Sequence, residues 1–98
     1  METHFRRALG NGPTIRVLEI LIEGRGLDHS LTDIAEQASI GWTTLHRIWP
    51  ELVRIGIVRQ TRTIGRAKMF VLNEQHPVAK RLIALFDTLI TERVRIAA

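Results

Sequence analysis

Residues 30–50, SLTDIAEQASIGWTTLHRIWP, predict two helices joined by a tight bend. Ser30 or Thr32 is a suitable cap for the first helix, and Asp33 then lies in the first turn, where the helix dipole favours negative charge. The link SIG is short and places a glycine at the bend. We therefore expect the second helix to begin at Trp42.

Each of these helices has one apolar face, and the opposite face of the second helix is left exposed. The apolar positions are Leu31, Ile34, Ala35 and Ala38 in the first helix, and Leu45, Ile48, Trp49 and Leu52 in the second. The exposed face of the second helix carries Trp42, Thr43, Thr44, His46 and Arg47. Trp49 is predicted to be a core residue, whereas Trp42 is left open between the core edge and a ligand contact. Pro50 predicts a bend in this helix, which we expect to close at Gly56.

Further segments frame this pair of helices. Helical spacing of apolar residues, with a proline at the start and glycines at the end, predicts a helix over 13–23. The runs IVRQTRT and AKMFVLN, separated by a glycine turn, predict a two-stranded β-hairpin. The predicted fold class is α+β. The chain divides into an N-terminal arm or short helix (1–12), a central domain (13–74) and a long C-terminal helix (76–96).

The basic charge is concentrated on the predicted hairpin. The 98 residues suffice for one domain and carry a net charge of +4. Residues 57–72 contain Arg59, Arg62, Arg66 and Lys68 and no acidic residue, so the whole excess lies there. Such a strip is either a solvated basic hairpin or a phosphate-binding element.

Composition and spacing disfavour several functional classes. The chain has no cysteine, which excludes disulfides and thiolate metal sites and fits a cytosolic protein. The histidines are widely spread, so we expect no metal and no cofactor. No catalytic triad, carboxylate pair or glycine-rich phosphate loop is recognisable, so we expect no enzyme. No secretion signal or membrane-spanning segment is expected either.

Four segments carry a family resemblance: GNGPTIRVLEILIE, TTLHRIWPELVRIGIV, TRTIGRAKMFVLN and HPVAKRLIALFDTLI. Over about residues 10–90 they resemble archaeal winged helix–turn–helix transcription regulators, which are similar to the MarR and ArsR families. The resemblance implies three helices followed by a two-stranded β-hairpin wing, with the long C-terminal helix added. ArsR-type metal sensors bind metal through cysteines, and this chain has none, so metal sensing does not transfer.

The resemblance and the charge pattern together predict an interface for double-stranded DNA. The third helix of the domain would enter the major groove, and the basic wing would lie on the backbone or in the minor groove. The candidate DNA contacts are Thr32, Trp42, Thr43, Thr44, His46, Arg47, Arg62, Arg66 and Lys68. Arg59 lies nearer the domain body and is undecided. The alternatives are a solvated helix face and a winged-helix module that docks on proteins of a transcription or replication assembly.

The C-terminal helix is predicted to pair two chains. Two adjacent apolar rows cover a wider arc than one small domain can bury. The predicted dimer contacts are Phe5, Leu82, Leu85, Phe86, Leu89 and Ile90. An intramolecular alternative exists if Phe5 and Leu9 fold over this helix. A two-fold dimer would place two recognition helices about one DNA turn apart, which predicts a palindromic site and a cytoplasmic, nucleoid-associated regulator.

Overall fold

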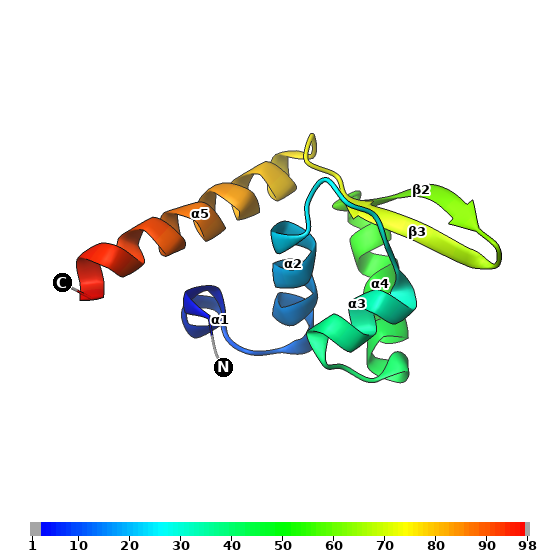
Figure 1. Ribbon diagram of the computed structural model, residues 1–98, viewed down its shortest axis with the longest axis horizontal. Coiled ribbons are helices and arrows are strands. Elements are labelled where there is room, and N and C mark those ends of the chain that lie inside the picture. Colours follow the sequence, from blue (N-terminus) through cyan, green and yellow to red (C-terminus); the bar gives the residue numbers. More distant parts are fainter. Residues whose placement is uncertain (1–2, 98) are drawn as a thin grey trace.

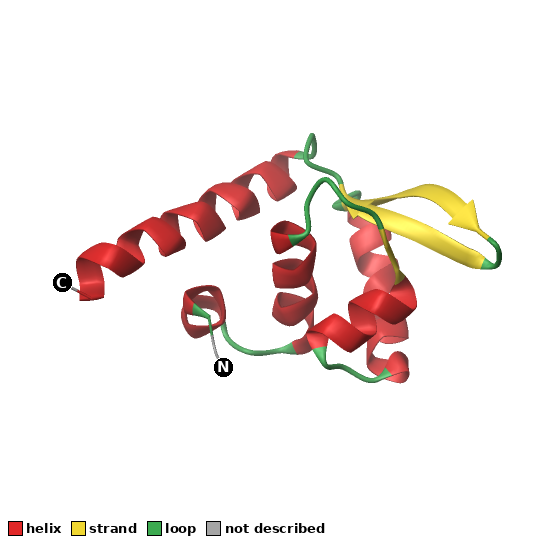
Figure 2. Cartoon of the chain, viewed as in Figure 1, coloured by secondary structure: helices red, strands yellow, loops and turns green. Residues whose placement is uncertain are grey.

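In a computed structural model of the protein, the backbone is described for residues 3–97 and the side chains for residues 3–91. Figures 1 and 2 show the arrangement of its helices and strands. In chain order the elements are α1 (His4–Leu9), α2 (Pro13–Glu23), β1 (His29–Ser30), α3 (Leu31–Ala38), α4 (Trp42–Ile55), β2 (Val58–Ile64), β3 (Ala67–Leu72) and α5 (Pro77–Ala97). The predicted α+β class and the added C-terminal helix are confirmed.

The caps of α3 and α4 explain why the decisive stretch folds as the sequence predicts. Ser30 accepts a hydrogen bond from the Asp33 backbone, and the Asp33 side chain accepts one from the Ser30 backbone, so the two form a capping box. Ser39 adopts the left-handed conformation at the end of α3 (φ 55°), and Gly56 does so after α4 (φ 93°). These residues hold α3 and α4 as two helices joined by a short turn.

The core lies between α2, α3, α4 and the sheet. Ile34, Ala38 and Leu45 are fully buried, and Trp49 packs its ring edge-to-face on Phe70 of β3 at 5.1 Å between centroids. The prediction that Trp49 is a core residue is therefore confirmed. Pro50 stands on the exposed side of α4, which continues through it as one helix. The buried Trp49 before Pro50 and the buried Leu52 after it stabilise that turn although one backbone hydrogen bond is lost.

The sheet has one more strand than the sequence predicts. Its order is β1-β3-β2, with both pairs antiparallel. In β1, His29 pairs with Phe70 and Ser30 with Met69. The two-stranded prediction missed β1 because a pair of residues is too short to show an alternating pattern. The β2–β3 hairpin turns at Gly65 (φ 62°) and projects from the body as the wing (Figure 1).

The N-terminal segment forms the short helix α1, one of the two alternatives left open. Phe5 is buried and meets Phe86 of α5 edge-to-face, with 5.5 Å between ring centroids. Arg6 forms an ion pair with the buried Glu19 of α2 at 2.8 Å, and the Thr3 hydroxyl donates to the same carboxylate. Helix α1 is thus held against both α2 and α5. Beyond α1, α5 continues away from the body toward the C-terminus (Figure 1).

Candidate nucleic-acid interface

The outer face of α4 presents the side chains that the sequence assigned to it. Thr43, His46 and Arg47 are exposed, while Thr44 is half-buried. Trp42 is 51% exposed and lies edge-on to His46, one turn later, with 4.4 Å between ring centroids. The ring of Trp42 therefore stands at the surface and is available to a ligand.

The N-terminus of α4 adds backbone donors to this face. Gly41 occupies the cap position, and no side chain in the described part of the chain caps this end. The first amide N–H groups of a helix have no partner within the helix, and they point along its axis with the positive end of the dipole. The start of α4 therefore offers donors suited to a phosphate, next to Thr43 and Thr44.

A shallow groove joins the start of α3, the start of α4 and the wing tip. Its lining residues are Ser30, Leu31, Thr32, Trp42, Arg66, Ala67 and Lys68. Four predicted DNA contacts from three separate elements thus meet in one hollow, two of them cationic. Thr32, Arg66 and Lys68 are all exposed there. Among the described residues, neither Arg66 nor Lys68 nor Arg47 forms an ion pair.

Arg62 lies apart from this groove, although it was grouped with Arg66 and Lys68. It forms a two-point ion pair with Asp28, through Nε at 2.9 Å and Nη2 at 3.2 Å. The Thr61 hydroxyl donates to the same carboxylate at 2.6 Å. The hydrogen bond from Arg62, followed by that from Thr61, lowers the pKa of Asp28 to about 2.

A β-bulge in the wing explains why Arg62 faces elsewhere. Gln60 pairs with Phe70 and Arg62 with Met69, so Thr61 is an extra residue between them. Without the bulge, Arg62 would oppose Lys68 and share its face; with it, Arg62 shares the face of Met69. The sequence gives no signal for this bulge, and the three cations were grouped because all of them lie in the basic hairpin segment.

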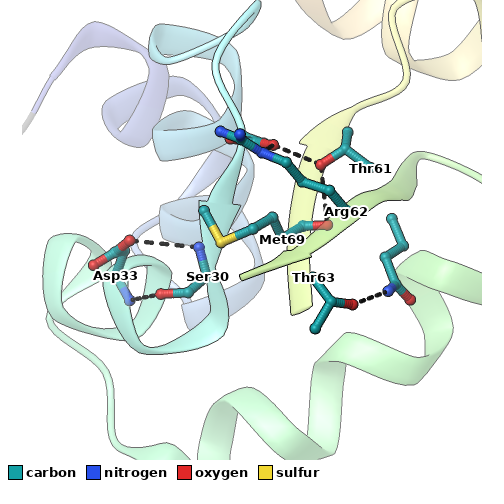
Figure 3. A network of polar contacts seen from close by, with 8 residues as sticks. Ser30, Asp33, Thr61, Arg62, Thr63 and Met69 are labelled. Carbon is teal, nitrogen blue, oxygen red and sulfur yellow. Dashed lines mark hydrogen bonds and ion pairs between the residues drawn. The ribbon is translucent and has the colours of Figure 1, made fainter. Parts of the chain in front are cut away.

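Two residues in contact with Arg62 or beside it, Asp28 and Thr61, were not among the predicted site residues. Asp28 is a single acid in a loop, and Thr61 is one of two threonines in the hairpin, so neither carries a recognisable motif. Figure 3 shows Thr61 and Arg62 beside Met69, with Ser30 and Asp33 at the start of α3 nearby. Arg59 lines a second hollow with Asp28 and Arg62, away from the α4 groove.

The sequence matches a family model over residues 14–62, from α2 to the wing. The model describes the IclR helix–turn–helix domain. The chain belongs to this family. It is a DNA-binding winged helix–turn–helix domain of the transcription-regulator type, with α3 and α4 as the helix–turn–helix pair and β2–β3 as the wing. No curated protein gives a significant match to the sequence.

Solved structures share the fold of this IclR-type domain. The homodimeric winged helix–turn–helix DNA-binding domain of Mb0332 from Mycobacterium bovis is 23% identical, with a TM-score of 0.62 over 93% of this chain and 79% of that one. ZitR from Lactococcus lactis is 17% identical, with a TM-score of 0.68 over 93% of this chain and 71% of that one. The DNA-binding protein Sso10a-2 from Sulfolobus solfataricus is 16% identical, with a TM-score of 0.57 over 84% and 82%. At these identities the likeness shows the winged-helix fold.

The residues predicted as dimer contacts of this domain divide into two groups. Phe5 and Phe86 pack on each other inside the protomer, as in the intramolecular alternative, and are not available at its surface. Leu82 and Leu89 are partly buried against the same core. Leu85 and Ile90 remain 38% and 51% exposed.

Two further kinds of feature are absent from the described residues. No helix among them combines the length and apolar character needed to cross a membrane. Within the same residues, no three side chains of the histidine, cysteine, aspartate or glutamate types gather as a metal site would require.

Proposed function

We propose that the chain is a sequence-specific regulator of transcription that binds double-stranded DNA as a homodimer. One observation carries the proposal. The exposed face of α4, with Arg47, adjoins a groove in which Arg66 and Lys68 lie close to the uncapped end of that helix. Arginine and lysine side chains without internal partners, beside an exposed helix, are suited to bind the phosphates that line a DNA groove.

In this mode α4 lies in the major groove and reads bases from its first turns. Arg47 is long and unpaired among the described residues, so its two-pronged guanidinium suits guanine O6 and N7. Thr43 and His46 flank it on the same exposed face and reach a thymine methyl or a base-edge acceptor. Thr44 is half-buried, which suits it to a phosphate beside the helix N-terminus.

The wing then lies on the adjoining backbone or in the minor groove. Arg66 stands at the hairpin tip. Lys68 follows two residues later and lies on the same face of β3 as Phe70, which packs on α4. Thr32 and Trp42 close the same groove from the helices and contact sugar and phosphate. Contacts of this kind set affinity and register more than base preference.

The dimer of the proposal pairs the outer part of α5. Ala79, Phe86 and Ile90 follow one another at helical spacing along the side of α5 that faces the body. The first two are buried, whereas Ile90 is 51% exposed, because α5 continues past the body at this point (Figure 1). A second copy of α5 packed on Ile90 would cover the exposed end of this apolar stripe. The Mb0332 domain, which shares the fold, is homodimeric, and this supports the pairing of two chains.

The DNA-binding part is tested by selecting bound sequences from a random duplex pool and then titrating the best site across a salt series. We expect an enriched palindrome and an affinity that falls steeply with salt, since phosphate contacts release counterions. As part of the same proposal, the regulator would act on the nucleoid in the cytoplasm. Weak binding without salt dependence would instead favour a module that docks on proteins.

The dimer part is tested by light scattering at tens of micromolar. The wild type should have twice the mass of one chain, and Ile90→Asp should shift it toward the monomer. Ala84→Asp is the matched control, because it adds the same charge to the exposed side of the same helix. A monomeric wild type would contradict both the dimer and the palindrome, while single-site DNA binding would stand.

A further inference from the structure

We propose that Asp28 is a positioning residue for the wing, which holds Arg62 away from the DNA and fixes the direction in which Arg66 and Lys68 point. The inference rests on the proposed DNA-binding function, which it deepens. Asp28 lies in the loop before β1, and its contacts come from β2, on the far side of the central strand β3.

The contacts of Asp28 form a brace across the sheet. Its two carboxylate oxygens accept from Arg62 at 2.9 and 3.2 Å, and one of them also accepts from the Thr61 hydroxyl at 2.6 Å. Thr61 also lies 3.4 Å from the Met69 carbonyl oxygen of β3, which ties the brace to the central strand. Although Arg62 is 63% exposed, only 16% of the Asp28 side chain is exposed, so the carboxylate is largely covered by its partners.

The brace acts at the bulge, the point that sets the direction of the wing. A bulge bends its strand and increases the local twist, so the hairpin beyond it needs an anchor to keep one orientation. Thr61 is the bulged residue itself, and Arg62 is the next one. Asp28 therefore joins the bulge to the domain body, while Thr63, Gly65 and Arg66 lie beyond it (Figure 3 shows Thr61, Arg62 and Thr63).

The brace also determines whether Arg62 is available to bind DNA phosphates. Its register puts it on the Met69 face of the hairpin, opposite to the face that carries Lys68 and Phe70. Phe70 packs on Trp49 of α4, so the Lys68 face is the one turned toward the recognition helix. Arg62 is thus both paired and on the wrong face for the DNA. Removal of the Asp28 charge should therefore change DNA affinity in an unusual direction. The net positive charge of the protein rises, and yet DNA binding should become weaker.

The test measures DNA affinity and its salt slope for the full chain and for Asp28→Asn. We expect binding roughly fivefold weaker, since the wing must now be ordered on the DNA. Thr61→Val removes one strut of the brace without a change of charge and should weaken binding in the same direction. Glu74→Gln is the matched control, because Glu74 lines the same hollow as Asp28 and forms no ion pair among the described residues. It should bind DNA as tightly as the wild type or more tightly.

A double-mutant cycle separates positioning from general loss of structure. Asp28 and Arg66 are not in hydrogen-bond contact, so two independent effects would add. If Asp28 positions the wing, Arg66→Ala should lower the salt slope less in the Asp28→Asn background than in the wild type. Thermal melting of each variant is the control, and each variant should unfold in a cooperative transition like the wild type.

The outcomes distinguish this inference from the proposed function. Wild-type binding that falls with salt, together with tighter binding by Asp28→Asn, would overturn the inference alone and make Arg62 a phosphate contact. Additive effects of Asp28→Asn and Arg66→Ala would overturn it as well. Absence of salt-dependent binding by the wild type would overturn both the inference and the function on which it rests.

Discussion

Replacing Phe5 by alanine tests whether the short helix α1 is part of the folded domain. Phe5 is 2% exposed, and its ring meets Phe86 edge-to-face. Burying a phenylalanine contributes about 1.5–3 kcal/mol, of which the alanine methyl keeps about 0.8. The edge-to-face pair adds about 1 kcal/mol. We therefore expect Phe5→Ala to lower the free energy of unfolding by about 2–3 kcal/mol.

The loss has an upper limit, because the variant can release α1 altogether. A helix of six residues has no stability of its own, so its docking depends on Phe5 and on the contacts of Thr3 and Arg6 with Glu19. Release would also uncover Phe86 and add to the exposed apolar surface of α5. We therefore expect Phe5→Ala to increase self-association at high protein concentration.

Urea unfolding at fixed, low protein concentration measures the effect. A Trp42→Phe background leaves Trp49, which packs on Phe70 in the core, as the single fluorescent reporter. For a domain of this size, the expected loss lowers the Tm by roughly 10–20 °C. The control is Leu9→Ala, on the same helix but 40% exposed, which should cost under about 1 kcal/mol. If Phe5→Ala matched the wild type within about 0.5 kcal/mol, α1 would not be docked in solution.

Three further predictions concern the interface. Arg47→Ala should cost roughly 1–3 kcal/mol on the selected site and relax preference at one base pair, and an equal loss on random DNA would make Arg47 a backbone contact. Arg66→Ala should lower the salt slope by about one unit on every sequence, and an unchanged slope would remove the wing tip from the interface. The Asp28 pKa is lowered to about 2 from its ordinary 3.8, so the stabilisation it gives is complete above pH 3.8 and is lost as the pH falls through 2. Carboxyl NMR titration should show this midpoint, and Arg62→Ala should raise it; a midpoint that does not move would contradict the pairing of Asp28 with Arg62.

The helices were predictable because their signals are local. The capping box of Ser30 and Asp33, the glycine at the bend and the apolar spacing of α3 and α4 all lie within one short stretch. The same holds for the exposed face of α4, because Leu45, Trp49 and Leu52 fix which side is buried. Local preference and tertiary packing agree there, so a periodic pattern is enough to assign both the element and its faces.

The wing was only partly predictable, because its geometry depends on pairing between distant segments. The strand β1 forms only because β3 offers a free edge to His29 and Ser30. The bulged Thr61 donates a hydrogen bond to Asp28, which lies 33 residues earlier in the chain. A one-residue change of register moves a side chain to the other face of a sheet, so the position of Arg62 could not follow from its place in the sequence.

The apolar residues of helix α5 were predicted from the sequence, but the cover that α1 provides for some of them was not. The width of the apolar arc of α5 predicted a dimer, yet part of that arc is covered by α1 through the contact of Phe5 with Phe86. What remains uncovered follows from the length of the helix. Its 21 residues span about 31 Å, and the body-facing stripe becomes exposed at Ile90. The part of α5 offered to a second chain therefore lies toward its C-terminal end, where a charge at Ile90 should disrupt pairing and one at Ala84 should not.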